Sequence, residues 1–426
     1  MVKIGILGVG TVGASVVKIL EQNADIIEAR AGQKIVVTSG VVKNLAKERG
    51  LDIKLSDNPL DIVDDPEIDI VVELMGGVEE PYMLVKRALK NGKAVVTANK
   101  ALLAYHRYEL QELAGDIPLM YEASTAGGIP IIGALRNGLS ANHIESIQGI
   151  MNGTCNYMLT KMINEGAQYD AILKEAQTLG YAEADPTFDV GGFDASHKLL
   201  ILASIAFGID AKPEDILIEG IQNINQTDVA FAKDFGYAIK LLGIAKKVHN
   251  KTYGEGVELR VHATMIPQES MIAKVDGVMN AVAVVGDRVG ETLYYGAGAG
   301  GDATASAVIS DIIDIVRGNQ GPMLGYKKGL EFGLKLLPKE EICSHYYLRM
   351  SVDDKKGVLA TVTQLFSEHD ISIEAMMQNP DNDHDERVEL LFITHECQEK
   401  MIQEAIQALE RLEVIYGSVA MIRIEQ

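Results

Sequence analysis

Apolar and polar positions in the first 130 residues follow two alternating patterns. Short runs rich in valine and isoleucine alternate with longer stretches of helical periodicity, and such short runs are typical of strands buried on both faces. Strands are expected at residues 2–7, 35–42, 68–74, 94–97 and 117–121. Strands that alternate with helices predict an α/β fold built on a parallel sheet.

The pattern changes between residues 131 and 317, where apolar and polar positions alternate along many of the runs. This alternation is typical of a sheet with one covered face, so we expect an α+β domain at residues 131–317. Strands are expected at 143–151, 241–248, 257–265, 278–285 and 292–295, and helices at 157–165 and 302–317.

The last part of the chain predicts a third, smaller domain at residues 345–426. Its expected elements are, in order, 346–352 (strand), 358–368 (helix), 371–377 (strand), 387–394 (strand), 398–412 (helix) and 418–424 (strand). This βαββαβ order is that of a ferredoxin-like unit. Residues 318–344, which contain Gly321-Pro322, are expected to form a linker.

A glycine pattern follows the first expected strand and opens the first helix. Its residues are Gly8, Val9, Gly10, Thr11, Val12 and Gly13. In this context the glycines allow a tight turn and a close approach of a pyrophosphate, which the N–H groups of the helix amino terminus attract. Residues 1–130 are therefore expected to form a Rossmann-type dinucleotide-binding domain, to which the helix at 302–317 returns. Gly8, Gly10, Thr11, Val12 and Gly13 are the candidate cofactor residues.

Further cofactor contacts are expected at strand ends, because ligands of open α/β sheets bind there. Gly76 and Lys100 follow the third and fourth strands, and Gly301 lies in a second glycine-rich turn. An acidic residue about 20 residues beyond the first glycines would indicate NAD. The second strand instead ends near Lys43, whose charge favours NADP, although NAD and a plain surface role for Lys43 stay open.

Charge is distributed unusually between Gly180 and Lys198. This stretch has no other lysine or arginine, and its acidic residues are Glu183, Asp185, Asp189 and Asp194. Lys198 heads an apolar run that lasts to Asp210, so its ammonium is expected to be half desolvated and to need a carboxylate partner. The alternative is an ordinary helical pair of Asp194 and Lys198, which contributes about 0.2–0.5 kcal/mol.

A third glycine-rich loop runs from Glu122 to Pro130. It offers one carboxylate and several backbone carbonyls, the ligands that hard cations prefer, and it could equally serve as a hinge.

Composition narrows the function classes. The 426 residues carry a formal charge of −21, which opposes binding to nucleic acid or to an anionic membrane. No apolar run approaches the roughly 18 residues that span a bilayer. The three scattered cysteines are typical of a reducing cytoplasm, where the protein is expected to act.

These features together resemble homoserine dehydrogenase. The resemblance rests on the glycine pattern at Gly8, on the segment Asn152-Gly-Thr-Cys-Asn156, and above all on Gly180-Tyr-Ala-Glu-Ala-Asp-Pro186 with the residues up to Lys198. Residues 345–426 look like an ACT domain, and the resemblance implies that residues 131–317 bind substrate and contribute to oligomerisation. Because the dinucleotide fold begins at residue 2, we expect a monofunctional enzyme without the aspartokinase of its bifunctional relatives.

The resemblance implies the reversible reduction of L-aspartate 4-semialdehyde to L-homoserine by NADPH or NADH. Lys198 would transfer the proton, Glu183 would bind the substrate ammonium, and Asp194 would position substrate and Lys198, with Asp189 nearby. Lys100 would lie between cofactor and substrate, and which lysine transfers the proton stays open.

The family's other ligands have expected places as well. The sodium site falls on Glu122, Thr125, Gly127 and Ile129. An amino-acid effector, expected to be threonine, would bind the ACT domain, and the assembly would be a homodimer or homotetramer.

Two other functions compete with this interpretation. Cys155 lies at a helix amino terminus, which would lower its pKa, so it could attack an aldehyde covalently with His143 or His197 as base. The chain could also be a non-enzymatic sensor of nucleotide and amino acid, although a sensor needs no proton donor.

Overall fold

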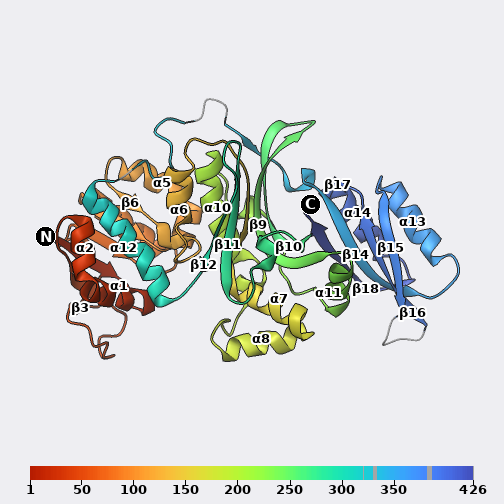
Figure 1. Ribbon diagram of the computed structural model, residues 1–426, viewed down its shortest axis with the longest axis horizontal. Coiled ribbons are helices and arrows are strands. Elements are labelled where there is room, and N and C mark those ends of the chain that lie inside the picture. Colours follow the sequence, from red (N-terminus) through yellow and green to blue (C-terminus); the bar gives the residue numbers. More distant parts are fainter. Residues whose placement is uncertain (320, 330–332, 381–385, 426) are drawn as a thin grey trace. The chain divides into compact units, whose positions relative to one another are not determined.

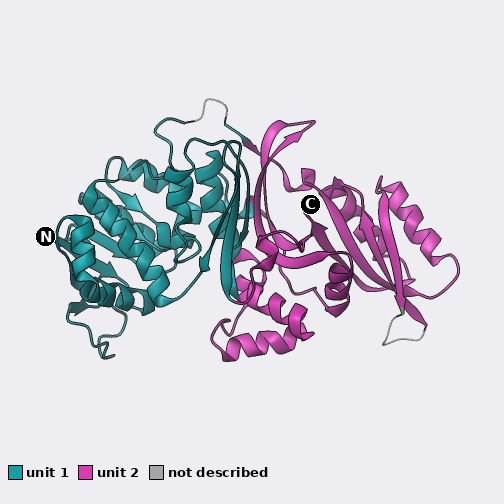
Figure 2. Cartoon of the chain, viewed as in Figure 1, with its two compact units in different colours: residues 1–153, 194–214, 278–334 teal, residues 154–193, 215–277, 335–426 magenta. Residues whose placement is uncertain are grey.

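The computed structural model describes residues 1–319, 321–329, 333–380 and 386–425. These residues form two compact units (Figure 2). Unit 1 contains residues 1–153, 194–214 and 278–334, and unit 2 contains residues 154–193, 215–277 and 335–426. The expected boundaries of three domains with a linker stay a prediction.

Unit 1 is built on a six-stranded parallel sheet (Figure 1). Its strands are β1 (Val2–Leu7), β2 (Ile35–Val41), β3 (Lys54–Ser56), β4 (Ile70–Glu73), β5 (Ala94–Thr97) and β6 (Leu119–Met120). The order β3-β2-β1-β4-β5-β6 is that of a Rossmann-type sheet, which confirms the expected fold class. Only β3 was missed, because the three residues Lys-Leu-Ser have no apolar run that would reveal a strand.

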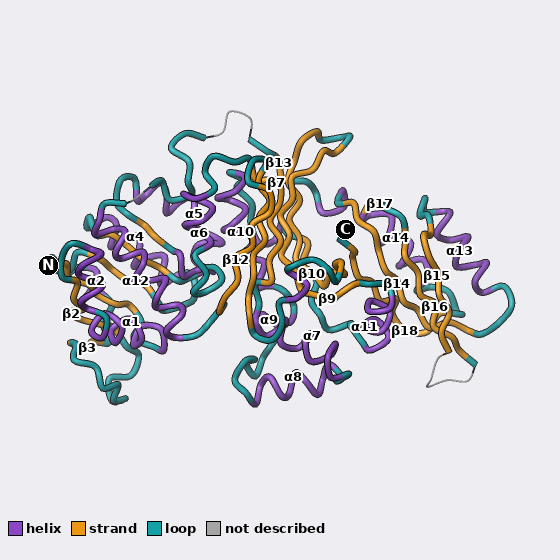
Figure 3. Tube along the Cα trace, viewed as in Figure 1, coloured by secondary structure: helices purple, strands orange, loops and turns teal. Residues whose placement is uncertain are grey.

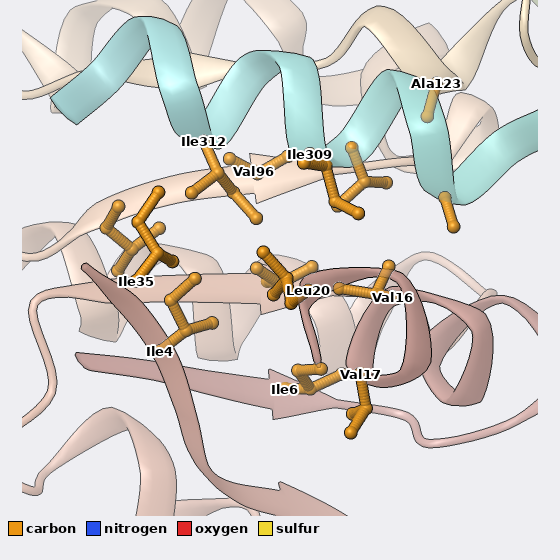
Figure 4. Close-up of a cluster of buried hydrophobic side chains, with 14 of the residues drawn as sticks. Ile4, Ile6, Val16, Val17, Leu20, Ile35, Val96, Ala123, Ile309 and Ile312 are labelled. Carbon is orange, nitrogen blue, oxygen red and sulfur yellow. The ribbon is translucent and has the colours of Figure 1, made fainter. Parts of the chain in front are cut away.

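Helices cover both faces of this sheet, and a late segment returns to it. The helices are α1 (Thr11–Gln22), α2 (Ala24–Ala31), α3 (Leu60–Val63), α4 (Glu79–Lys90), α5 (Lys100–Ala114) and α12 (Gly301–Arg317). Ile309 and Ile312 of α12 are buried in one cluster with Ile4, Val16 and Leu20 (Figure 4). The helix that lies almost 300 residues after α1 is therefore part of the same hydrophobic core.

The rest of unit 1 contains a smaller antiparallel sheet and a buried helix. The sheet has the order β12-β11-β7, with β7 (Ile144–Ile150), β11 (Met279–Gly286) and β12 (Gly290–Ala297). Short helical elements are η1 (Glu122–Ser124), α6 (Ile131–Gly133), η2 (Ala134–Gly138) and η3 (Pro213–Asp215). Helix α10 (Phe193–Phe207) is buried around nearly its whole circumference, as its uniform apolar sequence predicts.

Unit 2 combines helices with a long hairpin. Its helices are α7 (Gly153–Glu165), α8 (Tyr169–Thr178), α9 (Thr187–Val190), α11 (Gln226–Asp234) and η4 (Ile272–Lys274). Strands β9 (Tyr237–Asn250) and β10 (Gly254–Pro267) pair along their full length. They extend beyond the expected apolar runs, because the polar residues at their ends continue the same antiparallel pairing. β8 (Leu217–Ile218) pairs with β10. Helix α7 begins four residues earlier than expected.

The carboxyl-terminal part of unit 2 confirms the ferredoxin-like fold, and Figure 3 shows its strands in orange. Its elements are β14 (Cys343–Asp353), α13 (Val358–Glu368), β15 (Ile373–Pro380), β16 (Arg387–Thr394), β17 (Cys397–Gln398), α14 (Glu399–Leu409) and β18 (Ile415–Ile424). The sheet order is β18-β14-β16-β15, with every pair antiparallel.

Two contacts tie this fold to the hairpin. β18 pairs in parallel with β10 at Thr264 and Met265, and β13 (Lys335–Leu336), in the segment expected to be a linker, pairs with β10 as well. The turn η5 (Lys339–Glu341) follows β13. None of the helices described above is both long enough and apolar enough to pass through a membrane.

Candidate functional site

The three glycines of the first loop, Gly8, Gly10 and Gly13, occupy positions that favour glycine for different physical reasons. Gly8 has a positive φ of 98°, and a Cβ there would lie 2.7 Å from the Leu74 carbonyl oxygen. A Cβ on Gly13 would lie 2.6 Å from the Gly8 carbonyl oxygen, so α1 packs closely on the loop. A Cβ on Gly10 would meet no atom within 4 Å. The chain itself therefore does not need glycine at position 10, where the open space suits an approaching pyrophosphate.

A cavity of about 310 Å³ lies beside this loop. It is lined by Gly8, Val9, Gly10, Val41, Val42, Lys43, Arg49, Asp57, Pro59, Leu74, Met75 and Glu80. Lys43 thus lies near the end of the second strand, as expected, and lines the cavity. Arg49 was missed by the sequence reasoning. Its Nε donates to the Val9 carbonyl at 3.2 Å, and Nη1 donates to the Asn44 carbonyl at 3.0 Å, which holds a second positive charge beside the glycine loop.

The second glycine-rich turn reaches the same place. A Cβ on Gly301 would lie 2.7 Å from Ser15 Oγ and 3.2 Å from Thr11 Cγ2. The first turn of α12 therefore lies against the first turn of α1, next to Thr11 and Val12. Of the expected cofactor residues, Gly8, Gly10, Thr11, Val12, Gly13, Lys43 and Gly301 are brought together.

One buried carboxylate connects two lysines from distant parts of the chain. Asp194 Oδ2 accepts a hydrogen bond from Lys198 Nζ at 2.7 Å and from Asn152 Nδ2 at 3.0 Å. Asp194 Oδ1 lies 3.2 Å from Lys100 Nζ. Lys198 Nζ also donates to the Met151 carbonyl at 2.6 Å. The expected residues Lys100, Asp194 and Lys198 therefore form one cluster, which goes beyond an ordinary exposed helical pair.

The electrostatics of the cluster keep Asp194 ionised. Burial alone would raise the pKa of Asp194, but the Lys198 and Lys100 ammonium groups outweigh it and hold the pKa well below its usual range. Because this pKa is lower than in the unfolded chain, the carboxylate stabilises the fold at neutral pH, and that contribution is lost only as pH falls through the lowered pKa. Lys198 has three N–H donors, and its two hydrogen bonds use two of them. The third is available for a substrate oxygen.

The position of Lys100 depends on a buried network at the ends of β4 and β5. Lys100 is the first residue of α5, and Asn99 caps that helix by accepting from Leu102 N at 3.1 Å. The Asn99 side chain also donates to the Gly77 carbonyl at 2.8 Å. Gly77, which follows Gly76, is thereby connected to the residue that precedes Lys100.

Glu73 lies beneath this network and was missed by the sequence reasoning. Its carboxylate accepts from Thr97 Oγ1 at 2.6 Å and from Met75 N at 2.8 Å, and Thr97 Oγ1 accepts from Asn99 N at 3.0 Å. Glu73 is completely buried, and burial raises its pKa. A carboxylate at the end of an otherwise apolar strand was the signal available. The Glu73 carboxylate joins the loop after β4, which lines the cavity, to the start of α5.

Glu183 and Asp189 lie in unit 2, on the segment that carries α9. Glu183 is exposed and Asp189 is half-buried. The first turn of α7 holds this segment, since Thr154 Oγ1 donates to the Tyr181 carbonyl at 2.6 Å and Cys155 Sγ donates to the Asp189 carbonyl at 3.3 Å. Cys155 is completely buried, which opposes its role as a nucleophile and favours a role in anchoring Asp189.

The loop at Glu122 is packed tightly against the turn at Gly298. Gly127 has φ 55°, and a Cβ there would lie 2.5 Å from the Gly298 carbonyl oxygen, which opposes a hinge. The Glu122 carboxylate accepts from Ile132 N at 2.8 Å and Gly133 N at 2.7 Å.

The donor set of this loop is compatible with a monovalent cation. A carboxylate has about four acceptor positions, so Glu122 keeps capacity beyond its two hydrogen bonds. Thr125 is buried, and its Oγ1 meets no hydrogen-bond partner among the described residues. The Ile129 carbonyl accepts from Ile131 N at 2.8 Å. Across the same residues no group of three acidic, histidine or cysteine side chains converges as metal ligands, so a cation here would depend on oxygen atoms of the backbone.

Comparison with known proteins matches the three parts of the chain in turn. Residues 8–116 match the NAD-binding domain of homoserine dehydrogenase, residues 130–313 match homoserine dehydrogenase, and residues 346–414 match the ACT domain. Homoserine dehydrogenase of Helicobacter pylori is 53% identical over 422 residues, which are 99% of this chain and 98% of that protein.

Solved structures agree with the sequence matches. The crystal structure of a homoserine dehydrogenase from Thiobacillus denitrificans has a TM-score of 0.93 and 47% identity, and the match covers 100% of this chain and 98% of that one. A hyperthermophilic archaeal homoserine dehydrogenase in complex with NADPH has a TM-score of 0.63 and 26% identity, over 76% of this chain and 99% of that one. The chain therefore belongs to the homoserine dehydrogenase family and is an NAD(P)-dependent oxidoreductase.

Proposed function

We propose that Lys198 is the general acid of the homoserine dehydrogenase reaction, in which L-aspartate 4-semialdehyde is reduced to L-homoserine. The observation that carries this proposal is the position of Lys198 Nζ. It is held by the Met151 carbonyl and by ionised Asp194, and its side chain is only 12% exposed. An ammonium fixed in this way by two acceptors has its third N–H preorganised for a reacting oxygen.

The chemistry needs both a hydride and a proton. Bound NAD(P)H supplies the hydride to the aldehyde carbon. As that bond forms, the C=O π pair moves onto oxygen, and Lys198 stabilises the growing negative charge and transfers a proton to it. In the reverse direction neutral Lys198 takes the proton of the homoserine hydroxyl. Lys100 adds a second positive charge on the other oxygen of Asp194, so we assign it an electrostatic role.

Glu183 and Asp189 are proposed to hold the substrate. A carboxylate is the natural partner of the substrate's own ammonium, and Glu183 is exposed, whereas the Asp194 carboxylate is already paired with Lys198 and Lys100. Two side chains of α7, those of Thr154 and Cys155, donate to backbone carbonyls of the Tyr181–Asp189 segment. Asp194 would then act mainly through Lys198, as a positioning residue.

NADP is the proposed preferred cofactor. Lys43 and Arg49 both line the cavity beside the glycine loop, and a 2′-phosphate is the part of NADP that such charges would recognise. The archaeal relative described above was solved with NADPH. Gly76, Gly301 and Lys100 complete the proposed cofactor surroundings.

The remaining ligands and the assembly extend the proposal. The oxygen-rich loop at Glu122 supports a sodium ion held by Glu122, Thr125, Gly127 and Ile129, which would rigidify the loop. The βαββαβ unit supports an amino-acid effector, and the proposed place for this small zwitterion is the loop before α13, where Gly357 has φ 95°. Threonine stays the proposed effector. The domain boundaries, the homodimer or homotetramer and the cytoplasmic location stay predictions.

Replacement of Lys198 by alanine tests the general acid. Removing a positioned acid costs about 10²–10⁴ in rate, so kcat of homoserine oxidation should fall by that factor while NADPH still binds, as nicotinamide fluorescence would report. Cys155→Ala should lower kcat less than about tenfold, since it loses one weak hydrogen bond. Near-normal turnover of Lys198→Ala, or complete loss in Cys155→Ala, would reverse the assignment.

Replacement of Arg49 or Lys43 by alanine tests the cofactor proposal. Each variant loses a charge-assisted contact of about 1.5–3 kcal/mol, so KM for NADP+ should rise at least about tenfold while KM for NAD+ changes little. Lys47→Ala is the matched control, because Lys47 is exposed on the same loop and does not line the cavity. An equal rise of both KM values in Arg49→Ala would contradict a 2′-phosphate contact.

Steady-state homoserine oxidation with controlled salts and amino acids tests the cation and the effector together. Replacing sodium chloride by choline chloride at equal ionic strength should lower kcat, and sodium should restore it. L-threonine should inhibit, whereas D-threonine at the same concentration should not. A rate insensitive to sodium rejects the cation site, and a rate insensitive to L-threonine rejects that effector.

A further inference from the structure

A buried arginine near the end of the chain connects the ferredoxin-like fold to the rest of unit 2. Arg423 lies on β18, and its side chain is 1% exposed. Its Nη1 and Nη2 donate to the two carboxylate oxygens of Glu219 at 2.7 and 2.9 Å. On its other side, Nε donates to Glu399 at 2.9 Å, and the Tyr346 hydroxyl donates to the same carboxylate oxygen at 2.9 Å. Glu219 is therefore held by a guanidinium that α14 and β14 fix in place.

Glu219 passes this restraint to the α9 segment within two residues. It follows β8 directly, and its backbone N–H donates to the Val261 carbonyl of β10 at 2.8 Å. Ile221 N then donates to the Val190 carbonyl, the last residue of α9, at 3.0 Å. Asp189 immediately precedes Val190, and Asp194 follows four residues after it.

Close packing makes the contact between residues 190–192 and residues 219–221 rigid. A Cβ on Gly220 would collide with the Val190 carbonyl oxygen. Gly192 has φ 86°, and a Cβ there would lie 3.1 Å from Val261 Cγ1 and 3.3 Å from the Glu219 carbonyl oxygen. Glycine at both positions lets the two backbones approach without a gap, so a shift of residues 219–221 has to move residues 190–192.

We propose that Glu219 is a positioning residue for substrate binding: the Arg423–Glu219 bridge fixes Val190–Gly192, and substrate affinity therefore depends on the last strand of the ACT unit. This inference rests on the proposed role of Asp189 in binding substrate. It also gives a physical route from the ACT unit to the substrate. Any ligand that displaces β18 or α14 pulls on Arg423, then on Glu219, and then on the segment that carries Asp189.

Glu219→Gln in the full-length enzyme tests the bridge. The amide can accept only one of the two Arg423 hydrogen bonds, and its NH₂ group faces a second donor, so the bridge loosens while shape is kept. KM for homoserine should rise about tenfold, the equivalent of one charge-assisted hydrogen bond, and KM for NADP+ should stay within about twofold. Hydrogen exchange of the Ile221 and Gly192 amides should accelerate. A loss of global stability would instead accelerate amide exchange throughout the protein and not only in this segment.

Glu389→Gln is the matched control. Glu389 also connects the ferredoxin-like fold to another element, since it accepts from Thr227 of α11 at 3.1 Å and lies 3.7 Å from Arg349, but it does not contact residues 190–192. Its homoserine KM should stay unchanged. Glu219→Asp keeps the charge with a shorter side chain, so its homoserine KM should lie between those of wild type and Glu219→Gln even if the amide variant folds poorly.

The outcomes separate this inference from the function on which it rests. An unchanged homoserine KM in both Glu219 variants, or an equal rise in Glu389→Gln, overturns the bridge. Asp189→Asn reports on the proposed substrate contact by itself. If Asp189→Asn leaves the homoserine KM unchanged while the Glu219 variants raise it, the bridge stands and the assigned role of Asp189 is wrong.

Discussion

The ion cluster at Asp194 is the constraint on which the proposed active site depends. One buried carboxylate holds two ammonium groups, Lys198 from its own helix and Lys100 from the start of α5, and Asn152 completes it from the end of β7. Three separate chain segments thus meet at one charge. Loss of the lysines would leave the carboxylate as an uncompensated buried charge, and loss of the carboxylate would leave the lysines uncompensated. Either change is strongly destabilising. The arrangement therefore fixes both the geometry and the charge of Lys198, the residue proposed to transfer the proton.

Two further carboxylates, buried Glu73 and partly exposed Glu219, position the functional residues from outside the cluster. Glu73 joins the loop beside the cofactor cavity to the residues before Lys100, by hydrogen bonds to Met75 N and Thr97. Glu219 has the equivalent position in unit 2, between Arg423 and the segment that ends at Gly192. Each of these carboxylates accepts a hydrogen bond from an element far away in the sequence, β5 for Glu73 and β18 for Glu219. The fold thereby couples its cofactor loop to Lys100, and its last strand to the Asp189 segment.

Local patterns were sufficient to predict the Rossmann-type sheet, the ferredoxin-like unit and the pairing of Asp194 with Lys198, because each is encoded within a few consecutive residues. Partners from distant segments could not be predicted in this way. Arg49 and Glu219 resemble ordinary polar residues in the sequence, and Glu73 differs from them only in ending an apolar strand. The fold alone brings Val9, Thr97 and Arg423 to Arg49, Glu73 and Glu219, respectively. The strands β3 and β13 were missed for the same reason, since each is too short to show a pattern and is formed by its neighbour.

The central claim is that Asp194 holds Lys198 in position for proton transfer, and Asp194→Asn tests it most directly. The amide keeps the size of the side chain and removes the charge that fixes both lysines. Single-turnover oxidation of NADPH by aspartate 4-semialdehyde should be slowed by about 10²-fold or more, as expected when a positioned acid is lost, with NADPH affinity unchanged. Hydride transfer at close to the wild-type rate in a folded Asp194→Asn enzyme would contradict the account.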